Sequence, residues 1–124
     1  MKRIFSIFII ILTLIIACKK NETSAPTVTV LAPLSTDSFY VADSIALHFS
    51  IKDKNLVYYK AIFSNNSTHA IYYKEEGNTN ATDFIINKKI YFAVPSDTLI
   101  LLNVLGLDKN GNTGYASVVF KLKN

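Results

Sequence analysis

Apolar residues after Pro26 come in short runs separated by turn-forming residues, and this pattern constrains the fold most strongly. Between Ile45 and Ile51 every odd-numbered residue is large and apolar, whereas the residues between them are polar or small. A period of two predicts a β-strand with one buried face. No stretch after residue 17 shows helical periodicity, so the sequence predicts an all-β domain.

Other apolar runs predict the remaining strands. They span 27–31, 56–63, 70–73, 84–94 (one bent strand or two short ones), 98–107 and 114–122. The run 98–107 is nearly all apolar, which predicts a central strand covered on both faces. Turn residues separate the runs at 53–55, 65–67, 76–78, 95–97 and 108–112. Six to eight short strands favour an antiparallel β-sandwich.

The charge balance excludes several classes of protein. After Lys2 and Arg3 are set aside, 11 basic and 9 acidic side chains remain, too even for a strongly basic nucleic-acid binder or an acidic tail. The single cysteine rules out an intrachain disulfide scaffold, and with only two histidines we expect no Cys/His zinc site.

The amino terminus has the pattern of a secretory signal peptide. A basic start at residues 1–3 precedes a 13-residue apolar run at 4–16. A membrane-spanning helix needs about 20 apolar residues, so an uncleaved anchor is the less favoured alternative. We therefore expect residues 1–17 to be a signal-peptide helix.

Ile15-Ile16-Ala17-Cys18 resembles the bacterial lipobox, and Cys18 is the only cysteine of the chain. The resemblance implies a diacylglyceryl group on the Cys18 thiol, cleavage between Ala17 and Cys18, and acylation of the new amino terminus. Residues 18–26 would then be the lipidated cysteine and a polar tether, followed by one domain at 27–124. No Asp stands directly after Cys18, which favours the outer membrane if the source has two membranes, and Cys-Lys-Lys resembles Bacteroidota-type lipoproteins.

Several segments resemble bacterial immunoglobulin-like domains. They are 26–30, 43–47, 53–56 and 104–112, the last with an Asp-x-x-Gly-Asn turn. The resemblance implies an antiparallel immunoglobulin-like β-sandwich of about seven strands. The chain departs from antibody domains because it lacks their core Trp and paired cysteines.

We expect no enzymatic activity. His48 falls on the polar face of its strand and His69 in a loop, with neither a nucleophile elbow nor a glycine-built oxyanion loop in the sequence. Glu75 and Glu76 are adjacent in what reads as a polar loop, so they are interpreted as solubilising charge rather than as a catalytic pair.

Neither a cofactor nor a metal is expected. Asp53, Asn55 and Asp108 form a candidate calcium set, because the turns that hold them meet at one end of an immunoglobulin-like sandwich. Turn chemistry alone also explains these residues, and we favour that interpretation. Ser44 and Thr98 lie in short motifs similar to bacterial O-glycosylation sites, which strand starts explain equally well.

Tyrosine pairs supply the candidate ligand contacts. Tyr72 and Tyr73 should place one ring on each face of their strand. The outer ring, with Lys74 and Asn78, would contact a sugar or a partner, although cross-strand aromatic packing is the favoured alternative.

Two functional hypotheses follow. The first is a lipid-anchored, non-enzymatic binding or interaction module of the cell envelope, at the outer membrane and either periplasmic or surface-exposed. The alternative is a carbohydrate-binding accessory lipoprotein of a glycan-uptake system. The expected partners are the membrane, through Cys18, and a protein or glycan, but no nucleic acid. The tether should leave from the end that carries 53–55 and 108–112, and the loops 33–42, 64–69, 75–82 and 95–97 should lie at the opposite end.

Overall fold

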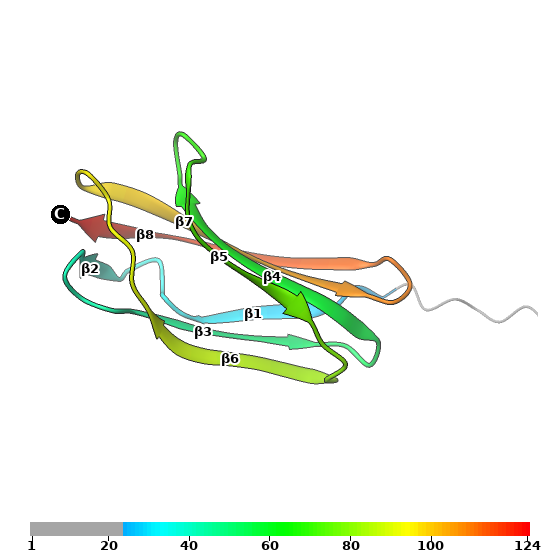
Figure 1. The fold of residues 1–124 in the computed structure, drawn as a ribbon. Helices are drawn as coiled ribbons and strands as arrows, with labels where there is room; N and C mark the ends of the chain where they lie inside the picture. The colour runs from blue at the N-terminus through cyan, green and yellow to red at the C-terminus, as the bar shows by residue number, and fades with distance from the viewer. Residues whose placement is uncertain (1–23) are drawn as a thin grey trace, which may run out of the picture.

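Eight β-strands form two packed sheets in the computed structural model, which describes residues 24–124 (Figure 1). The strands are β1 (Thr27–Ala32), β2 (Ser38–Tyr40), β3 (Ile45–Lys52), β4 (Leu56–Asn65), β5 (Ile71–Asn78), β6 (Asp83–Ile90), β7 (Thr98–Asp108) and β8 (Thr113–Lys123). The predicted signal-peptide helix lies outside the described residues. Within 24–124 there is no helix long and apolar enough to cross a membrane.

The expected all-β sandwich is confirmed. One sheet has three strands in the order β1-β3-β6, and the other has five in the order β2-β8-β7-β4-β5. All pairings are antiparallel except that of β2, which runs parallel to β8. The three-residue β2 was missed in the sequence because it is too short to show any period.

The alternation in β3 has the predicted register. The odd-numbered residues from Ile45 to Ile51 are buried, and those between them are partly or fully exposed. Together with residues of β4, β6, β7, β8 and the 91–97 segment they form one core between the sheets. Its members are Ile45, Leu47, Phe49, Ile51, Leu56, Ala61, Phe63, Ile90, Val94, Ile100, Leu102, Val104, Phe120 and Leu122.

Strand β7 departs from the prediction for 98–107. It is central in its sheet, as expected, but only one of its faces is covered. Ile100, Leu102 and Val104 are buried in the core, whereas Leu99 is exposed and Leu101 is half-buried on the outer face. The apolar run therefore supplies an outer leucine-rich face rather than a second buried one.

The segment 76–78 is not the predicted turn. Residues Ile71–Asn78 form a continuous strand, β5, that pairs with β4, so Glu75 and Glu76 lie in a sheet rather than in a loop. Their polarity is explained by position, because β5 is the edge of its sheet. The run predicted at 84–94 forms one strand, β6, which ends at Ile90. Residues 91–97 then cross to the other sheet without regular secondary structure.

The sandwich has two ends, which differ in what they carry (Figure 1). The proximal pole holds Ser24 and the turns 53–55, 79–82 and 109–112. The backbone N–H of Lys109 donates to the Asn55 carbonyl oxygen (2.9 Å), and that of Asp53 donates to the Thr82 carbonyl oxygen (3.1 Å). The expected meeting of 53–55 with 108–112 is thus confirmed, but 79–82 lies with them rather than opposite.

The distal pole holds the loops 33–37, 41–44, 66–70 and 91–97 together with Asn124 (Figure 1). Hydrogen bonds join these segments. The N–H of Asn66 donates to the Leu99 carbonyl oxygen (3.0 Å), and the Asn124 N–H and side-chain amide donate to Asp97 (3.0 Å) and the Pro95 carbonyl oxygen (2.8 Å). These backbone and side-chain hydrogen bonds brace the distal loops against the ends of β7 and β8.

Candidate functional site

Exposed apolar side chains gather at the distal pole. Nine large hydrophobic residues are exposed in the described part of the chain, and six belong to distal strand ends or loops. We call these six the distal surface: Leu31, Leu34, Tyr40, Ile71, Tyr91 and Leu99. The six share one end of the molecule, with Leu31 in the three-stranded sheet and Leu99 on the outer face of the five-stranded one, and exposed apolar groups occur at interaction sites.

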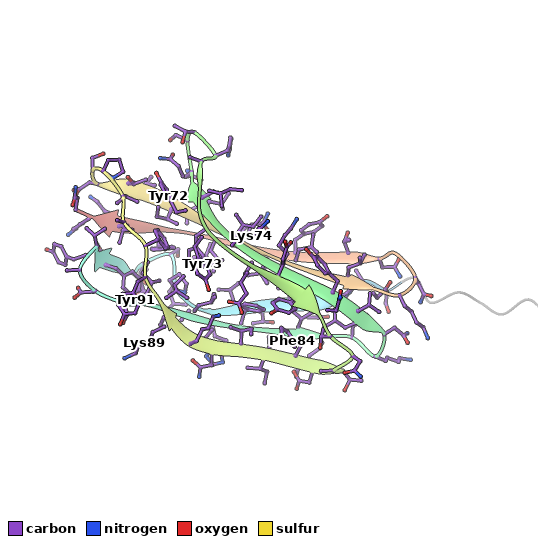
Figure 2. All side chains as sticks on the ribbon, viewed as in Figure 1. Tyr72, Tyr73, Lys74, Phe84, Lys89 and Tyr91 are labelled. Carbon is purple, nitrogen blue, oxygen red and sulfur yellow. The ribbon has the colours of Figure 1, made fainter. Side chains whose placement is uncertain are left out.

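Tyr91 is the most exposed of the six, at 67%. It directly follows the buried Ile90 and precedes Phe92, whose ring lies 5.5 Å from that of Phe63 and stacks on Tyr72 at 5.7 Å. Because both neighbours are held in the core, the ring between them points outward. Figure 2 shows Tyr91 toward the same end of the molecule as Tyr72 and Tyr73, with Phe84 toward the other.

Tyr40 is presented by the short strand β2. Phe39 packs edge-on against Phe120 at 5.7 Å, which anchors the strand, and alternation turns Tyr40 outward. The Lys123 ammonium lies 5.5 Å from the Tyr40 ring centroid, a cation–π geometry. One ring face is therefore available and the other is beside a positive charge.

The loops beneath the distal surface are fixed by side-chain caps. The Leu34 N–H donates to the Asp37 carboxylate (2.7 Å), which closes the turn that presents Leu34. The Asn65 side-chain oxygen accepts the N–H groups of Ser67 (2.8 Å) and Thr68 (2.9 Å) just before Ile71. Such caps hold the backbone still, so partner binding would cost little loop ordering.

The structure places both predicted contact tyrosines against the core rather than on opposite faces. The Tyr73 ring lies edge-on to Phe63 at 6.0 Å, and the Tyr72 ring stacks on Phe92. The cause is an irregularity in the β4–β5 pairing, where the register shifts between Phe63 and Ser64. The Asn65 side-chain amide donates to the Tyr72 hydroxyl (3.2 Å), which also ties this ring down.

Lys74 and Asn78 do not join the two tyrosines. Lys74 forms an ion pair with Glu76 (3.2 Å) on the outer face, and Asn78 ends β5 at the proximal pole. Glu76 also accepts a hydrogen bond from the Tyr58 hydroxyl. That bond and the Lys74 interaction hold the pKa of Glu76 below its usual value. The candidate set Tyr72, Tyr73, Lys74 and Asn78 is therefore spread over different surfaces.

A polar cluster bridges the two sheets where β5 and β6 lie at their edges. The Lys88 ammonium lies 2.5 Å from the Glu75 carboxylate, and the Tyr73 hydroxyl donates to the same carboxylate (3.3 Å). The hydrogen bond with Glu75 raises the pKa of Lys88. These contacts join the sheets, so Glu75 has a structural partner that the sequence did not reveal.

The candidate calcium residues are occupied by turn hydrogen bonds. The Asp108 carboxylate accepts the N–H groups of Asn110 and Asn112 and the Asn112 side-chain amide, each at 2.8 Å. Burial alone would raise the pKa of Asp108, but these bonds outweigh it and lower the pKa. Asp53 accepts the Asn55 N–H (2.6 Å). Residues 24–124 contain no group of three or more His, Cys, Asp or Glu that could hold a metal.

The remaining predicted site residues are located as follows. His48 lies half-buried in β3, on the outer side of the three-stranded sheet, and His69 lies in the 66–70 turn with a positive φ of 63°. Ser44 directly precedes β3, and Thr98 is the first residue of β7. Ala17 and Cys18, the predicted cleavage and lipidation residues, lie outside the described residues.

The distal surface itself was missed in the sequence. Its members sit at strand ends and in turns, where no period applies; the available signal was an apolar residue beside turn formers, as in Pro33-Leu34-Ser35. Comparison with protein-family models and with curated proteins gives no match to this chain.

Proposed function

We propose that this chain is a lipid-anchored protein of the cell envelope and that its sandwich is a non-enzymatic binding module. The anchor is the lipidated Cys18, attached at the outer membrane, and the contact region is the distal surface. The domain hangs in the periplasm or stands on the cell surface according to the leaflet that holds the lipid. The observation that carries the proposal is the gathering of six exposed apolar side chains at the pole opposite Ser24.

An immunoglobulin-like topology is part of this proposal. It is supported by the strand order β1-β3-β6 against β2-β8-β7-β4-β5 and by the β2 strand that switches sheets to run parallel to β8. Such a sandwich is a rigid scaffold that holds loops at two opposite ends.

The geometry of the tether supports outward presentation. The eight residues 19–26 reach at most about 26–29 Å when extended. Strand β7 has 11 residues and so adds about 36 Å between the poles. The distal surface would therefore stand well clear of the membrane, while the proximal pole stays near it.

Energetics favour a partner that covers several of these side chains. Complete burial of one large apolar side chain contributes about 1.5–3 kcal/mol. Part of that gain is lost to the entropy of association, so two or three contacts are needed for measurable affinity. Tyr91 and Tyr40 are well suited, since tyrosine offers apolar area and a hydroxyl.

Site-specific photo-cross-linking in cells tests the proposal. A photoreactive residue placed at Tyr91 and one placed at Leu34 should each cross-link to the same partner, so the two adducts should show the same increase in mass. Tyr115 is the matched control, since it is a tyrosine of similar exposure (61%) on the outer face of β8. Adducts at Tyr115 but not at Tyr91 and Leu34 would refute the distal surface as the contact region.

Glycan binding is the second candidate function, and the exposed ring of Tyr91 favours it. A ring exposed to this extent presents a face on which a sugar can stack. A glycan array should then give signals that Tyr91→Ala abolishes and Tyr115→Ala leaves intact. An array with no signal, beside a protein adduct at Tyr91, would support the first function instead.

A further inference from the structure

The four sheet edges are not equally protected against pairing with another chain. Strand β2 is only three residues long. The pairing of β1 with β3 has a register shift between Val30 and Ala32. The pairing of β5 with β4 also has a register shift, and β5 carries three charged residues. Short strands, irregularities and charges are the usual ways of blocking an exposed edge.

Strand β6 also carries three charges, Asp83, Lys88 and Lys89, but it is neither short nor irregular. All eight of its residues pair with β3 without a register shift. No other strand of the described chain lies on its second side. It ends the three-stranded sheet, and Ile85 on it is 56% exposed.

The ladder shows which backbone groups face the free side. The N–H of Asp53 donates to the Thr82 carbonyl oxygen, and this pair extends the register of β3 and β6 by one residue beyond Lys52 and Asp83. Antiparallel strands exchange hydrogen bonds at every second pair. Counting from Thr82, the N–H and C=O groups of even-numbered residues face β3. Those facing outward belong to Asp83, Ile85, Asn87 and Lys89.

We propose that β6 pairs antiparallel with β6 of a second copy of this chain, joining two three-stranded sheets into one of six strands. The twofold axis passes through Ile86. Asp83 then lies opposite Lys89 of the second copy, and Ile85 lies opposite Asn87. In this register all eight outward backbone groups of each copy find partners, giving eight hydrogen bonds.

Charge complementarity favours this occupant over an unrelated strand. Asp83 and Lys89 are both exposed, and the register that satisfies the backbone also pairs them twice, once at each end. A shift of two residues leaves one end of the edge unpaired and separates the charges. A shift of one residue would place inward and outward side chains on the same face.

Disulfide trapping in the full chain tests the register. Residue 86 meets its own copy in a non-hydrogen-bonded pair with Cα atoms about 4.5 Å apart, within disulfide range. Residue 87 is offset from its own copy by about 9 Å, which is too far. Ile86→Cys should give a covalent dimer on non-reducing gels. Asn87→Cys and the wild-type chain, which has only Cys18, should not.

Charge reversal separates pairing from misfolding. Lys89→Asp in the Ile86→Cys chain should lower the dimer yield severalfold, and adding Asp83→Lys should restore it. Restoration is not expected if the single change merely disrupts folding. The proposal is overturned if Ile86→Cys gives no dimer, if Asn87→Cys gives as much, or if the double reversal fails to recover the yield.

Discussion

Phe49 is among the largest fully buried side chains of the core. Its side chain is fully buried, and its ring lies 6.4 Å from those of Tyr59 and Phe84. Phe49→Ala should cost about 3–5 kcal/mol of unfolding free energy, against a typical total of about 5–15 kcal/mol. His48→Ala, on the outer side of the same strand, should cost less than about 1 kcal/mol. Urea denaturation measures both, and the reverse order would place β3 out of register by one residue.

Glu76 should give the domain an acid-sensitive contribution to stability. Its folded pKa lies below the ordinary 4.5 because the Tyr58 hydroxyl and Lys74 favour the carboxylate. The unfolded chain therefore takes up the proton first, so this contribution is present above pH 4.5 and is lost as the pH falls through the folded pKa. The stability difference between wild type and Glu76→Gln should shrink over that window in denaturation series. A constant difference would contradict the assignment.

Cys18 is the proposed site of lipid attachment. Serine cannot form the thioether to the diacylglyceryl group, so Cys18→Ser should abolish lipid attachment. Metabolic labelling with a fatty-acid analogue measures this directly. If mutant and wild type were labelled equally, the lipoprotein proposal would fail, whereas the fold of residues 24–124 would be unaffected.

At the scale of elements, most strands with one buried face were readable from the sequence, whereas β2 and the second half of β5 were not. Strands β3 and β8 alternate cleanly because one side meets the core and the other meets water. In β5 the run Lys74-Glu75-Glu76-Gly77 lacks the apolar alternation by which a strand is recognised. Its charged side chains form the ion pairs Lys74–Glu76 and Glu75–Lys88 in place of apolar packing. In β7 the outer face is apolar like the buried face, so the run was predicted to be covered on both sides. Hydrophobicity alone does not tell a covered surface from an exposed one.

Gly114 fixes how β8 starts beside the entry to β1. A Cβ on Gly114 would fall 1.9 Å from the Pro26 carbonyl oxygen, and this clash involves backbone that cannot rotate away. Gly114→Ala should therefore cost about 3 kcal/mol by forcing the two segments apart. Gly111 has a φ of 83° and open space around it, so Gly111→Ala should cost only about 1–2 kcal/mol of backbone strain. Equal losses in denaturant midpoint would contradict this packing.

At the scale of the whole molecule, the sequence predicted one pole and part of the other. The joining of 53–55 with 108–112 was implied by the resemblance to immunoglobulin-like sandwiches and is confirmed by the Lys109 hydrogen bond. The 79–82 turn was expected at the distal pole, but β5 carries the chain back, so this turn lies at the proximal one. The distal surface escaped prediction because its side chains converge only after both sheets are assembled.

In the proposed function, the membrane anchor holds the proximal pole inward and leaves the distal pole free for a partner. Protease sites engineered into the 66–70 turn and the 109–112 turn test it directly on the membrane-bound protein. The 66–70 site should be cut faster, and the difference should disappear in detergent or in the Cys18→Ser chain. Equal rates on the membrane, or faster cutting at 109–112, would contradict the proposed orientation.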